Sequence, residues 1–560
     1  MVFEGMNNFK HYFTAIVLLA IYSCGKEKTI PDPVKPITPT SFAFNALKVN
    51  GAFNGFVYTG VNTAPVIYLS FTAPINHTSV ASGITFKSNA GTTVTYSTVY
   101  QNGDSTIVIT PNALQYLTQY SVAVSTGLQS KSGGSLQSGL AVQLTTAIDS
   151  TNKFPLITDD ELLDLVQKQT LKYFYDFGHP VSGMALERNT SGDVVTTGGS
   201  GFGIMAMVAG ISRNFISRAD GLTRLQKIVA FLKTAQTFHG AFPHWMNGAT
   251  GVVIPFSTQD DGADLVETAY LMEGLLTARQ YFNGTSTTET NLRADINTLW
   301  NAVEWDWFRN GGQNTLFWHW SPNFAWSSNQ QVNGWDEALI TYVLAASSTT
   351  HSVPKIVYDN GWALNGGIKN GSIYYGTKLP LGPIEGGPMF FAHYSFLGIN
   401  PNSLTDAYAS YDVQNKAHAM INYSYCVANP QSNMGYSADC WGLTASDIEN
   451  GYTASSPTND VGVIAPTAAI SSLPYTPTQS LKALHFFYYK LGDKLWGQYG
   501  FYDSFDLNDN WVSGTYLAID QGPMIDMIEN YRTGLLWSLF MSCPEVKTGM
   551  KNLGFTSPNL

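Results

Sequence analysis

The spacing of the apolar residues changes near residue 150, and this change divides the chain into two parts. Between residues 41 and 147, short β-prone runs such as 66–71 and 106–111 are separated by turn residues. From about residue 155 onward, apolar residues recur with the spacing of a helix. The sequence therefore predicts a multidomain protein in which a β domain precedes a large all-α domain. A length of 560 residues also exceeds that of one typical domain.

The first part has the pattern of a β-sandwich. Short strands at this spacing, with turns at 102–104 and 132–134, are typical of that architecture. No catalytic constellation is visible in residues 41–147, so we interpret them as a spacer or docking module. The domain resembles the Ig-like domains of bacterial surface proteins in four segments: 69–75, 109–111, 117–122 and 144–146.

The second part, residues 155–560, has the pattern of paired helices. Thr158 and Glu161 form a capping-box signature that opens an amphipathic helix through Phe174. About twelve helices separated by Gly-, Asn- and aromatic-rich loops indicate an (α/α)6 toroid, with loops at one end forming a cleft. The other predicted helices lie near 202–213, 217–237, 262–282, 288–303, 334–348, 355–364, 386–396, 405–425, 461–472, 476–491 and 521–541.

The N-terminal segment has the pattern of an export signal. Lys10 precedes an apolar run at 12–22 that is too short to remain a membrane-spanning helix, and the run ends at Cys24. Residues 1–24 resemble a bacterial lipoprotein signal peptide, with an ordinary cleaved secretory signal as the alternative. The Pro-rich residues 25–40 form a semi-rigid linker. We therefore expect lipidation of Cys24 and an outer-membrane lipoprotein that faces the periplasm or the cell surface.

Net charge limits the partners. The formal charge is −11 and basic blocks are absent, which argues against nucleic acid and against anionic polysaccharides. The 13 Trp and 30 Tyr favour neutral sugars, whose faces stack on aromatic rings, although aromatic residues also fill large cores. We expect a neutral glucan or gluco-oligosaccharide as substrate and a monomeric protein.

The cysteines do not indicate a metal site. Cys426, Cys440 and Cys543 include no C-x-x-C pair, so zinc is not expected, and we predict no metal and no cofactor. Cys426 and Cys440 can form a disulfide in an exported protein, or remain two buried thiols.

The segment 259–268 concentrates acids in a chain with only 12% charged residues. On a helix, Asp260, Asp264 and Glu267 fall within about 60° of arc. One reason to keep such a stripe is acid/base chemistry, in which one carboxyl holds a proton while another stays ionised. The alternative is that acids simply favour the first turn of a helix.

Two further acids stand next to aromatic residues or glycines. Asp336 and Glu337 follow Trp335 at the start of a predicted helix; we interpret Asp336 as a cap and Glu337 as functional. Glu385 lies among glycines, which allow a ligand to approach the backbone closely. His393 and Tyr394 follow it.

Other polar clusters have weaker signals. His239 and His244, beside Trp245, have poor metal-ligand spacing and are either sugar-binding or buried structural groups. The Gly-rich run 198–203 lacks the Lys of a phosphate-binding loop, and no strand clearly precedes it, so we predict a tight entry into an inner helix. Residues 503–510 miss the positions of an EF-hand.

Six segments of the helical part match one enzyme family: 163–170, 260–268, 386–396, 441–447, 519–524 and 528–532. Together they resemble the glucoamylase-like domain of Bacteroidetes lipoproteins, grouped as glycoside hydrolase family 144. The resemblance implies an (α/α)6 barrel and inverting hydrolysis of β-1,2-glucan or its oligosaccharides. It maps the candidate catalytic acids onto Asp260, Asp264, Glu267 and Glu337.

These observations lead to a specific hypothesis for the site. Asp264 or Glu267 donates the proton, Glu337 activates water and Asp260 positions either group, with acid and base roughly 6.5–9.5 Å apart. A polysaccharide lyase and a non-catalytic glycan-binding lipoprotein remain as alternatives, and endo and exo action are both open. The residues predicted to bind substrate are Arg188, His239, His244, Trp245, Trp335, Glu385, His393, Tyr394, Trp441 and Asp460.

Overall fold

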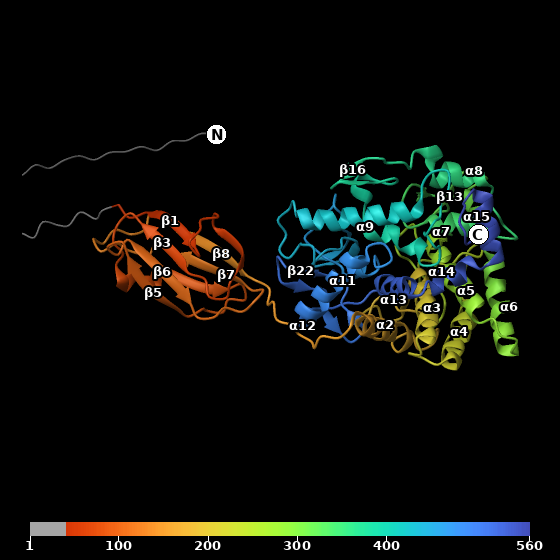
Figure 1. Cartoon of the computed structure of the whole chain (residues 1–560), viewed down its shortest axis with the longest axis horizontal. Coiled ribbons are helices and arrows are strands. Elements are labelled where there is room, and N and C mark those ends of the chain that lie inside the picture. The colour runs from red at the N-terminus through yellow and green to blue at the C-terminus, as the bar shows by residue number, and fades with distance from the viewer. Residues whose placement is uncertain (1–40) are drawn as a thin grey trace, which may run out of the picture.

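The computed structural model describes residues 41–560, and the chain forms a β domain at one end and a larger helical domain at the other (Figure 1). The predicted signal peptide 1–24, the linker 25–40 and Cys24 lie outside the described residues. Within residues 41–560, no helix combines the length and the apolar character needed to cross a membrane.

The β domain consists of two four-stranded sheets that enclose one core. Their strand orders are β1-β3-β6-β5 and β2-β8-β7-β4, and β2 runs parallel to β8. Alternate side chains of β3 point inward, so Ile67, Leu69 and Phe71 are buried. The strands are β1 (Phe44–Val49), β2 (Val57–Val61), β3 (Ile67–Phe71), β4 (Ile84–Ser88), β5 (Tyr96–Gln101), β6 (Thr106–Pro111), β7 (Gln119–Val124) and β8 (Leu140–Thr146), with a short helix α1 (Val80–Gly83) between β3 and β4.

The helical domain follows with α2, whose predicted capping box is present at Thr158 and Glu161. Figure 1 shows its helices packed around α3, α5 and α13. Its helices are α2 (Asp159–Tyr175), α3 (Thr197–Ser212), α4 (Arg218–Leu232), α5 (Leu265–Tyr281), α6 (Thr287–Ala302), α7 (Leu339–Ser347), α8 (Lys355–Val357), α9 (Tyr411–Ala428), α10 (Pro466–Ile470), α11 (Pro477–His485), α12 (Gly492–Leu495), α13 (Ala518–Arg532), α14 (Leu535–Met541) and α15 (Pro544–Leu553).

Short strand pairs shape the loops between these helices. The three-stranded sheet β9–β10–β11 and the pairs β12–β14 and β18–β19 lie near the acids discussed below. The strands are β9 (Val194–Thr196), β10 (Trp245–Asn247), β11 (Val253–Ile254), β12 (Ala263–Asp264), β13 (Leu316–Phe317), β14 (His319–Trp320), β15 (Gln331–Val332), β16 (Ile373–Tyr374), β17 (Thr377–Lys378), β18 (Ala445–Ile448), β19 (Gly451–Ala454), β20 (Trp496–Gly497), β21 (Gly500–Phe501), β22 (Phe505–Asp506) and β23 (Trp511–Val512).

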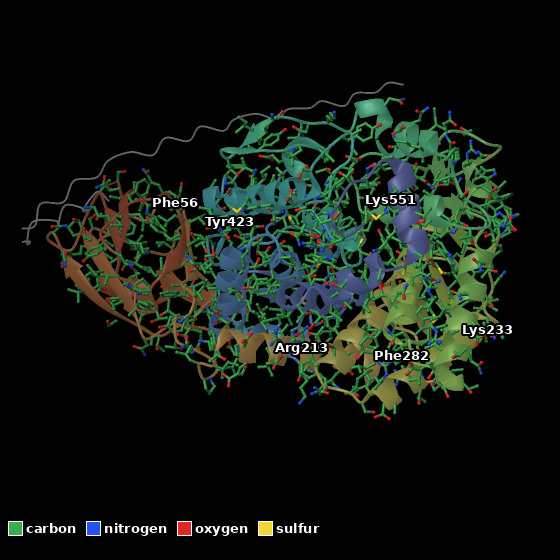
Figure 2. All side chains as sticks on the ribbon, turned by 45° about the vertical axis from the view of Figure 1, so that its right-hand side comes forward. Phe56, Arg213, Lys233, Phe282, Tyr423 and Lys551 are labelled. Carbon is green, nitrogen blue, oxygen red and sulfur yellow. The ribbon has the colours of Figure 1, made fainter. Side chains whose placement is uncertain are left out.

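Inner and outer helices differ in the side chains they bury. In α3 every residue from Thr197 to Ile211 is buried, whereas α4 and α6 bury one face only. The outer faces carry charges: Lys233, at the end of α4 and labelled in Figure 2, pairs with Asp295 of α6 at 2.5 Å. The apolar character of an inner helix therefore reflects its burial on all sides.

Glycines bring α3 and α5 into backbone contact. A Cβ at Gly201 would lie 2.2 Å from the carbonyl oxygen of Tyr270, and a Cβ at Gly274 would lie 2.2 Å from that of Gly201. Only glycine permits this approach. The Gly-rich run is thus an entry into an inner helix, as predicted; the prediction that no strand precedes it is wrong, because β9 does.

Several predicted helices differ from the structure. The segment 386–396 forms three short 3-10 turns, 384–386, 389–392 and 394–396, because Gly386 and Gly387 adopt positive φ and Pro388 follows them. The helix predicted at 334–348 begins only at Leu339. The final helix α15 was not predicted.

Candidate active site

Asp264 is the N-cap of α5. Its Oδ1 accepts hydrogen bonds from the backbone N–H groups of Val266 (3.0 Å) and Glu267 (2.9 Å). The prediction that Asp260, Asp264 and Glu267 share one helical face is therefore wrong, because only Glu267 lies inside the helix. The turn that precedes α5 nevertheless places the carboxylate of Asp260 close to that of Asp264.

Two histidines hold the two aspartates together. His244 Nδ1 lies 2.9 Å from Asp264 Oδ2 and 3.8 Å from Asp260 Oδ2. His319 Nε2 lies 3.2 Å from Asp260 Oδ2 and 3.4 Å from Asp264 Oδ2. The exposed fractions of the residues Asp264 and Asp260 are 0% and 5%. We call these four residues the imidazole–carboxylate cluster.

Charge is balanced within this cluster. Burial alone would lower the pKa of both histidines, but the acids around them raise it to about 9 for His244 and about 10 for His319. Although burial acts in the opposite direction, hydrogen bonds from the histidines hold the pKa of Asp264 below its usual range. Burial raises the pKa of Asp260. Since the ions pair, the cluster is compatible with its buried position.

Glu267 lies on the first turn of α5, between this cluster and α3. Its Oε2 accepts a hydrogen bond from Gly198 N–H at 2.7 Å, and its Oε1 lies 4.0 Å from His244 Nε2. Burial is the main cause that raises the pKa of Glu267 to about 7. This carboxyl thus has both a hydrogen-bond donor and a cation that favour its ionised form.

Glu337 precedes α7 and has a different environment. Burial, followed by the charges of Glu267 and Asp264, raises its pKa to about 7. Within residues 41–560, no Lys, Arg or His forms an ion pair with Glu337. Its neighbour Asp336 accepts the N–H of Ala338 at 2.8 Å, which agrees with the predicted cap. The pKa values of Glu337 and Glu267 are thus raised to a similar extent, and within residues 41–560 only Glu267 has a histidine as an ion-pair partner.

Aromatic rings lie beside His244. Its ring centroid is 4.2 Å from that of Phe256, which also contacts Trp245 and is 51% exposed. His239, in contrast, has structural partners: it stacks on Trp307 and bonds Glu304 at 2.8 Å. The exposed ring of Phe256 is a surface on which a sugar can stack.

The structure contains a second group of buried acids around Arg188. Arg188 was predicted to bind substrate, but none of these acids was predicted as a site residue. The guanidinium of Arg188 donates to Glu187 (2.9 Å) and to Asp447 (3.0 Å). Asp503 and Asp520 interact directly, and Asp503 Oδ1 and Asp520 Oδ2 lack a donor. The pair is stable only when it holds a proton, and burial raises the pKa of Asp503 to about 7.

Tyr394 connects the two groups of acids. Burial raises the pKa of its phenol, and the charges of Asp520, from one group, and of Glu337 and Glu267, from the other, raise it further. The signal that points to the second group is the pair of motifs 441–447 and 519–524, in which Asp447 and Asp520 lie.

Three predicted substrate-binding residues are core residues in the structure. Trp441 is 0% exposed and donates its indole N–H to Gln479. Trp335 is buried and donates to His418. His393 is buried against Ser472 at 3.0 Å, and burial lowers its pKa to about 3. All three side chains are buried with protein partners, and their role in substrate binding stays a prediction.

Two other predicted residues have partners away from these acids. Asp460 accepts hydrogen bonds from Tyr425, Asn433 and Tyr436, and so ties loops together. Glu385 is partly exposed in a positive-φ turn next to Tyr375.

The cysteines are free thiols: Cys426, Cys440 and Cys543 are buried and unpaired, so the possible disulfide between Cys426 and Cys440 is absent.

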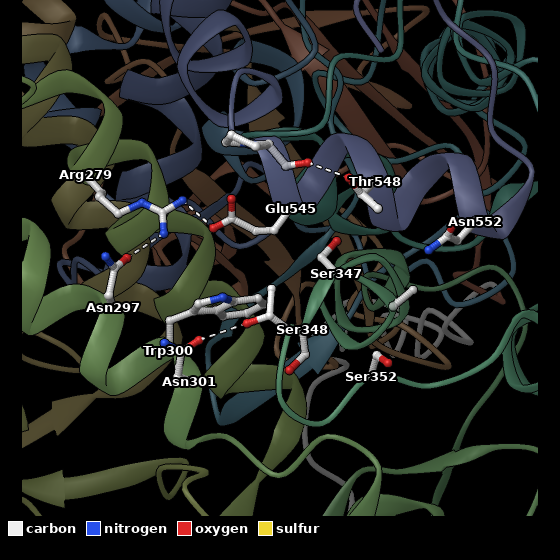
Figure 3. A pocket seen from close by; sticks show the side chains of 13 residues that line it. Arg279, Asn297, Trp300, Asn301, Ser347, Ser348, Ser352, Glu545, Thr548 and Asn552 are labelled. Carbon is white, nitrogen blue, oxygen red and sulfur yellow. Dashed lines mark hydrogen bonds and ion pairs between the residues drawn. The ribbon is translucent and has the colours of Figure 1, made fainter.

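A separate cavity lies at the other end of α5. It measures about 500 Å³ and contains the Arg279–Glu545 ion pair and the Arg279–Asn297 hydrogen bond of 2.7 Å (Figure 3). Arg279 lies twelve residues beyond Glu267, roughly 18 Å along the helix axis. Glu545, the acid that lines this cavity, is neutralised by Arg279. The cavity therefore offers no free carboxyl pair for catalysis.

Comparison with family models finds a match to each domain. The Glycoamylase model, which describes glucoamylase-like proteins, matches residues 329–544. A model of a bacterial Ig-like domain matches residues 49–146.

Known proteins are similar to most of the chain. The exo β-1,2-glucooligosaccharide sophorohydrolase (non-reducing end) of Parabacteroides distasonis is 45% identical over 427 residues, 72% of this chain. The chain spans only 59% of that relative's length. A solved endo-β-1,2-glucanase of Chitinophaga pinensis, in complex with sophorotriose and glucose, is 50% identical, with a TM-score of 0.71 over 72% of this chain and 100% of its own.

A third similar protein extends over both domains. The solved β-1,2-glucanase of Parabacteroides distasonis is 36% identical and has a TM-score of 0.70. The match covers 93% of this chain and 74% of that protein. The order of an Ig-like β domain and a helical domain therefore has a counterpart of known structure.

Proposed function

The chain belongs to the glucoamylase-like family, and from this membership we propose that it is a glycosidase that hydrolyses β-1,2-linked glucan or its oligosaccharides. The observation that carries the proposal is the pair Glu267 and Glu337, two buried carboxyls with pKa values raised to about 7, of which Glu267 alone forms an ion pair with a histidine among the described residues. Hydrolysis of a glycoside requires this combination of a proton donor and an ionised partner.

Glu337 is the proton donor in this proposal. It forms no ion pair with a Lys, Arg or His in the part of the chain that the structure describes, and the negative charges of Glu267 and Asp264 favour its neutral form. In the reaction it transfers its proton to the glycosidic oxygen while the bond from that oxygen to the anomeric carbon breaks. The sequence favoured Asp264 or Glu267 as donor; Asp264 is unsuitable, because its pKa is lowered and it caps α5.

Glu267 is the base. The N–H of Gly198 and the imidazolium of His244 stabilise its charged form. It accepts a proton from a water molecule whose oxygen attacks the anomeric carbon, so the configuration inverts as the family resemblance implies. The exposed ring of Phe256 beside His244 gives a sugar ring a stacking surface.

We also propose that the helical domain forms an (α/α)6 toroid. The fully buried α3 and the one-sided α4 and α6 support inner and outer layers, as in an (α/α)6 toroid. An experimental structure of the helical domain, with six inner and six outer helices counted, tests this arrangement.

The test of the function is a panel of β-1,2-, β-1,3-, β-1,4- and α-1,4-glucans. We expect reducing ends to be released from β-1,2-glucan alone, because the relatives act on this linkage. A ladder of products indicates endo action, and a single disaccharide indicates exo action. Binding without release of reducing ends favours a glycan-binding protein, and a product absorbing in the ultraviolet favours a lyase; either result contradicts the proposal.

We propose, from the sequence, that Cys24 is lipidated and anchors a monomeric enzyme at the outer membrane. One acyl chain binds a membrane only marginally, so durable anchoring requires more than one. Cys24→Ser is expected to move the protein into the soluble fraction and to leave its activity on soluble glucan unchanged. Fractionation of the variant with membranes would contradict the anchor, and a mass in solution above that of one chain would contradict the monomer.

A further inference from the structure

We propose that His319 is a positioning residue that, together with His244, neutralises Asp260 and Asp264 as a pair of imidazolium ions and so leaves Glu267 and Glu337 as the carboxyls that exchange the catalytic proton. This inference rests on the proposed function. His319 does not need to touch the substrate, because it acts through the aspartates.

The backbone fixes His319 next to the aspartates. His319 lies on β14, directly opposite Asp264 on β12, and the N–H of Leu265 donates to the carbonyl of Trp318 at 2.9 Å. The side chain of His319 is only 12% exposed. The strand pairing thus fixes the backbone of His319 opposite Asp264, and burial limits the space open to its ring.

The ring of His319 points between the two acids. Its Nε2 lies 3.2 Å from Asp260 Oδ2 and 3.4 Å from Asp264 Oδ2, within ion-pair distance of both carboxylates. Among the described residues, neither oxygen of Asp260 accepts a hydrogen bond, so its charge is met by the ion pairs with His319 and His244 alone. Without a cation here, Asp260 would be a buried acid beside the anion of Asp264, an arrangement that is strongly unfavourable.

His244 supplies the second positive charge. It precedes β10 and lies 2.9 Å from Asp264 Oδ2 and 4.0 Å from Glu267 Oε1. The charged groups that act on the two histidines are thus Asp260 and Asp264 for His319, with Glu267 in addition for His244. Two cations and two anions balance, and the raised pKa values of the histidines agree with this state.

The charge balance of the imidazole–carboxylate cluster affects the pKa values of the catalytic pair, Glu267 and Glu337. The charge of Asp264 contributes to the raised pKa of Glu267 and of Glu337. A cation removed from the cluster leaves this negative charge less compensated, so the pKa values of the nearby carboxyls rise further. His319 therefore controls the pH range in which Glu267 is ionised, which is the range of activity.

A bound divalent cation is the competing explanation of the same geometry. Ligand atoms of His244, Asp260 and Asp264 all lie within 4.8 Å of one another. A metal requires neutral imidazoles, whereas the proposal requires imidazolium ions. The two explanations thus predict opposite protonation states.

The first experiment measures protonation without reference to activity. Histidine-labelled protein is titrated by NMR, and the resonances are assigned with His244→Gln and His319→Gln variants. We expect both rings to remain doubly protonated at pH 7.5. Neutral rings at that pH, or one equivalent of metal whose removal by chelator abolishes activity, would overturn the proposal.

The second experiment measures kinetics. His319→Gln is expected to move the acidic limb of the kcat/KM profile upward by about one pKa unit, which lowers activity below neutral pH about tenfold. The double variant His319→Gln/Asp260→Asn removes both charges of one pair and should return the limb toward its original pH. An unchanged profile in His319→Gln, in a folded protein, would contradict the proposal.

A matched control is available on the surface. His351 bonds Asp306 at 2.9 Å, but the two side chains are 35% and 48% exposed. His351→Gln should leave the profile unchanged, because exposed ion pairs contribute little. If the wild type releases no reducing ends from β-1,2-glucan, the proposed function fails, while the NMR titration still decides the charge of His319.

Discussion

Replacement of Glu337 with glutamine is expected to lower kcat on β-1,2-glucan by about 10²- to 10⁴-fold, the usual contribution of a general acid. Glutamine keeps the shape of the side chain but has no proton to give to the glycosidic oxygen. The wild-type rate should fall as the pH rises through about 7, because Glu337 then loses the required proton. This alkaline limb should be absent from the residual activity of the variant.

The neighbour of Glu337 provides the control. Asp336 caps α7, and burial holds its pKa well above the usual range, so asparagine resembles its neutral form closely. Asp336→Asn should therefore change kcat far less than Glu337→Gln. A folded Glu337→Gln variant with near-normal kcat would contradict the assignment of the donor. Loss of kcat in Asp520→Asn with retention in Glu267→Gln would instead move the base to the second group of acids.

Local sequence patterns predicted the parts of the fold that depend on neighbouring residues. The alternation in β3 and the capping box of α2 are encoded within a few positions, and both are present. The arrangement of the helices and the end of each helix depend on contacts between distant segments. The 386–396 segment illustrates this limit, because its apolar spacing is helical while Gly386, Gly387 and Pro388 interrupt the backbone.

The acids of the site were predictable because they are rare and close together in the sequence. Asp260, Asp264 and Glu267 fall within eight positions, although their grouping arises from a helix cap and a turn and not from one helical face. His319 gave no such signal, since only the pairing of β12 with β14 brings it opposite Asp264.

Aromatic residues were the least predictable part of the site. The sequence cannot distinguish a Trp that fills a core from one that stacks on a sugar, because both require a large apolar ring. Trp335 and Trp441 proved to be core residues, whereas Phe256, which was not singled out, is the exposed ring beside His244.

Replacement of Asp264 with asparagine is expected to lower the free energy of unfolding by ~3–5 kcal/mol at pH 7, the usual cost of removing one partner from a buried ion pair. Asparagine keeps the cap of α5, so this loss reports on the charge, while Asp264→Ala should lose about 1 kcal/mol more with the cap. Activity should fall in both variants, because Glu337, the proton donor, loses a negative charge that helps it to retain its proton.

The pH dependence of this loss follows from the two partners of the pair. The pKa of Asp264 is lowered in the folded protein, so its contribution is present above its unfolded pKa of about 4 and disappears as the pH falls through the folded value. The pKa of His244 is raised to about 9, so its contribution is lost as the pH rises through that value. Denaturant unfolding of wild type and Asp264→Asn should therefore differ most between these limits.

Ser286→Ala is the control, because it removes only the cap of the outer helix α6. It should cost about 1 kcal/mol of unfolding free energy at every pH, because its loss involves no charged side chain. An Asp264→Asn variant as stable as the wild type at pH 7 would mean that the imidazole–carboxylate cluster is not ionised.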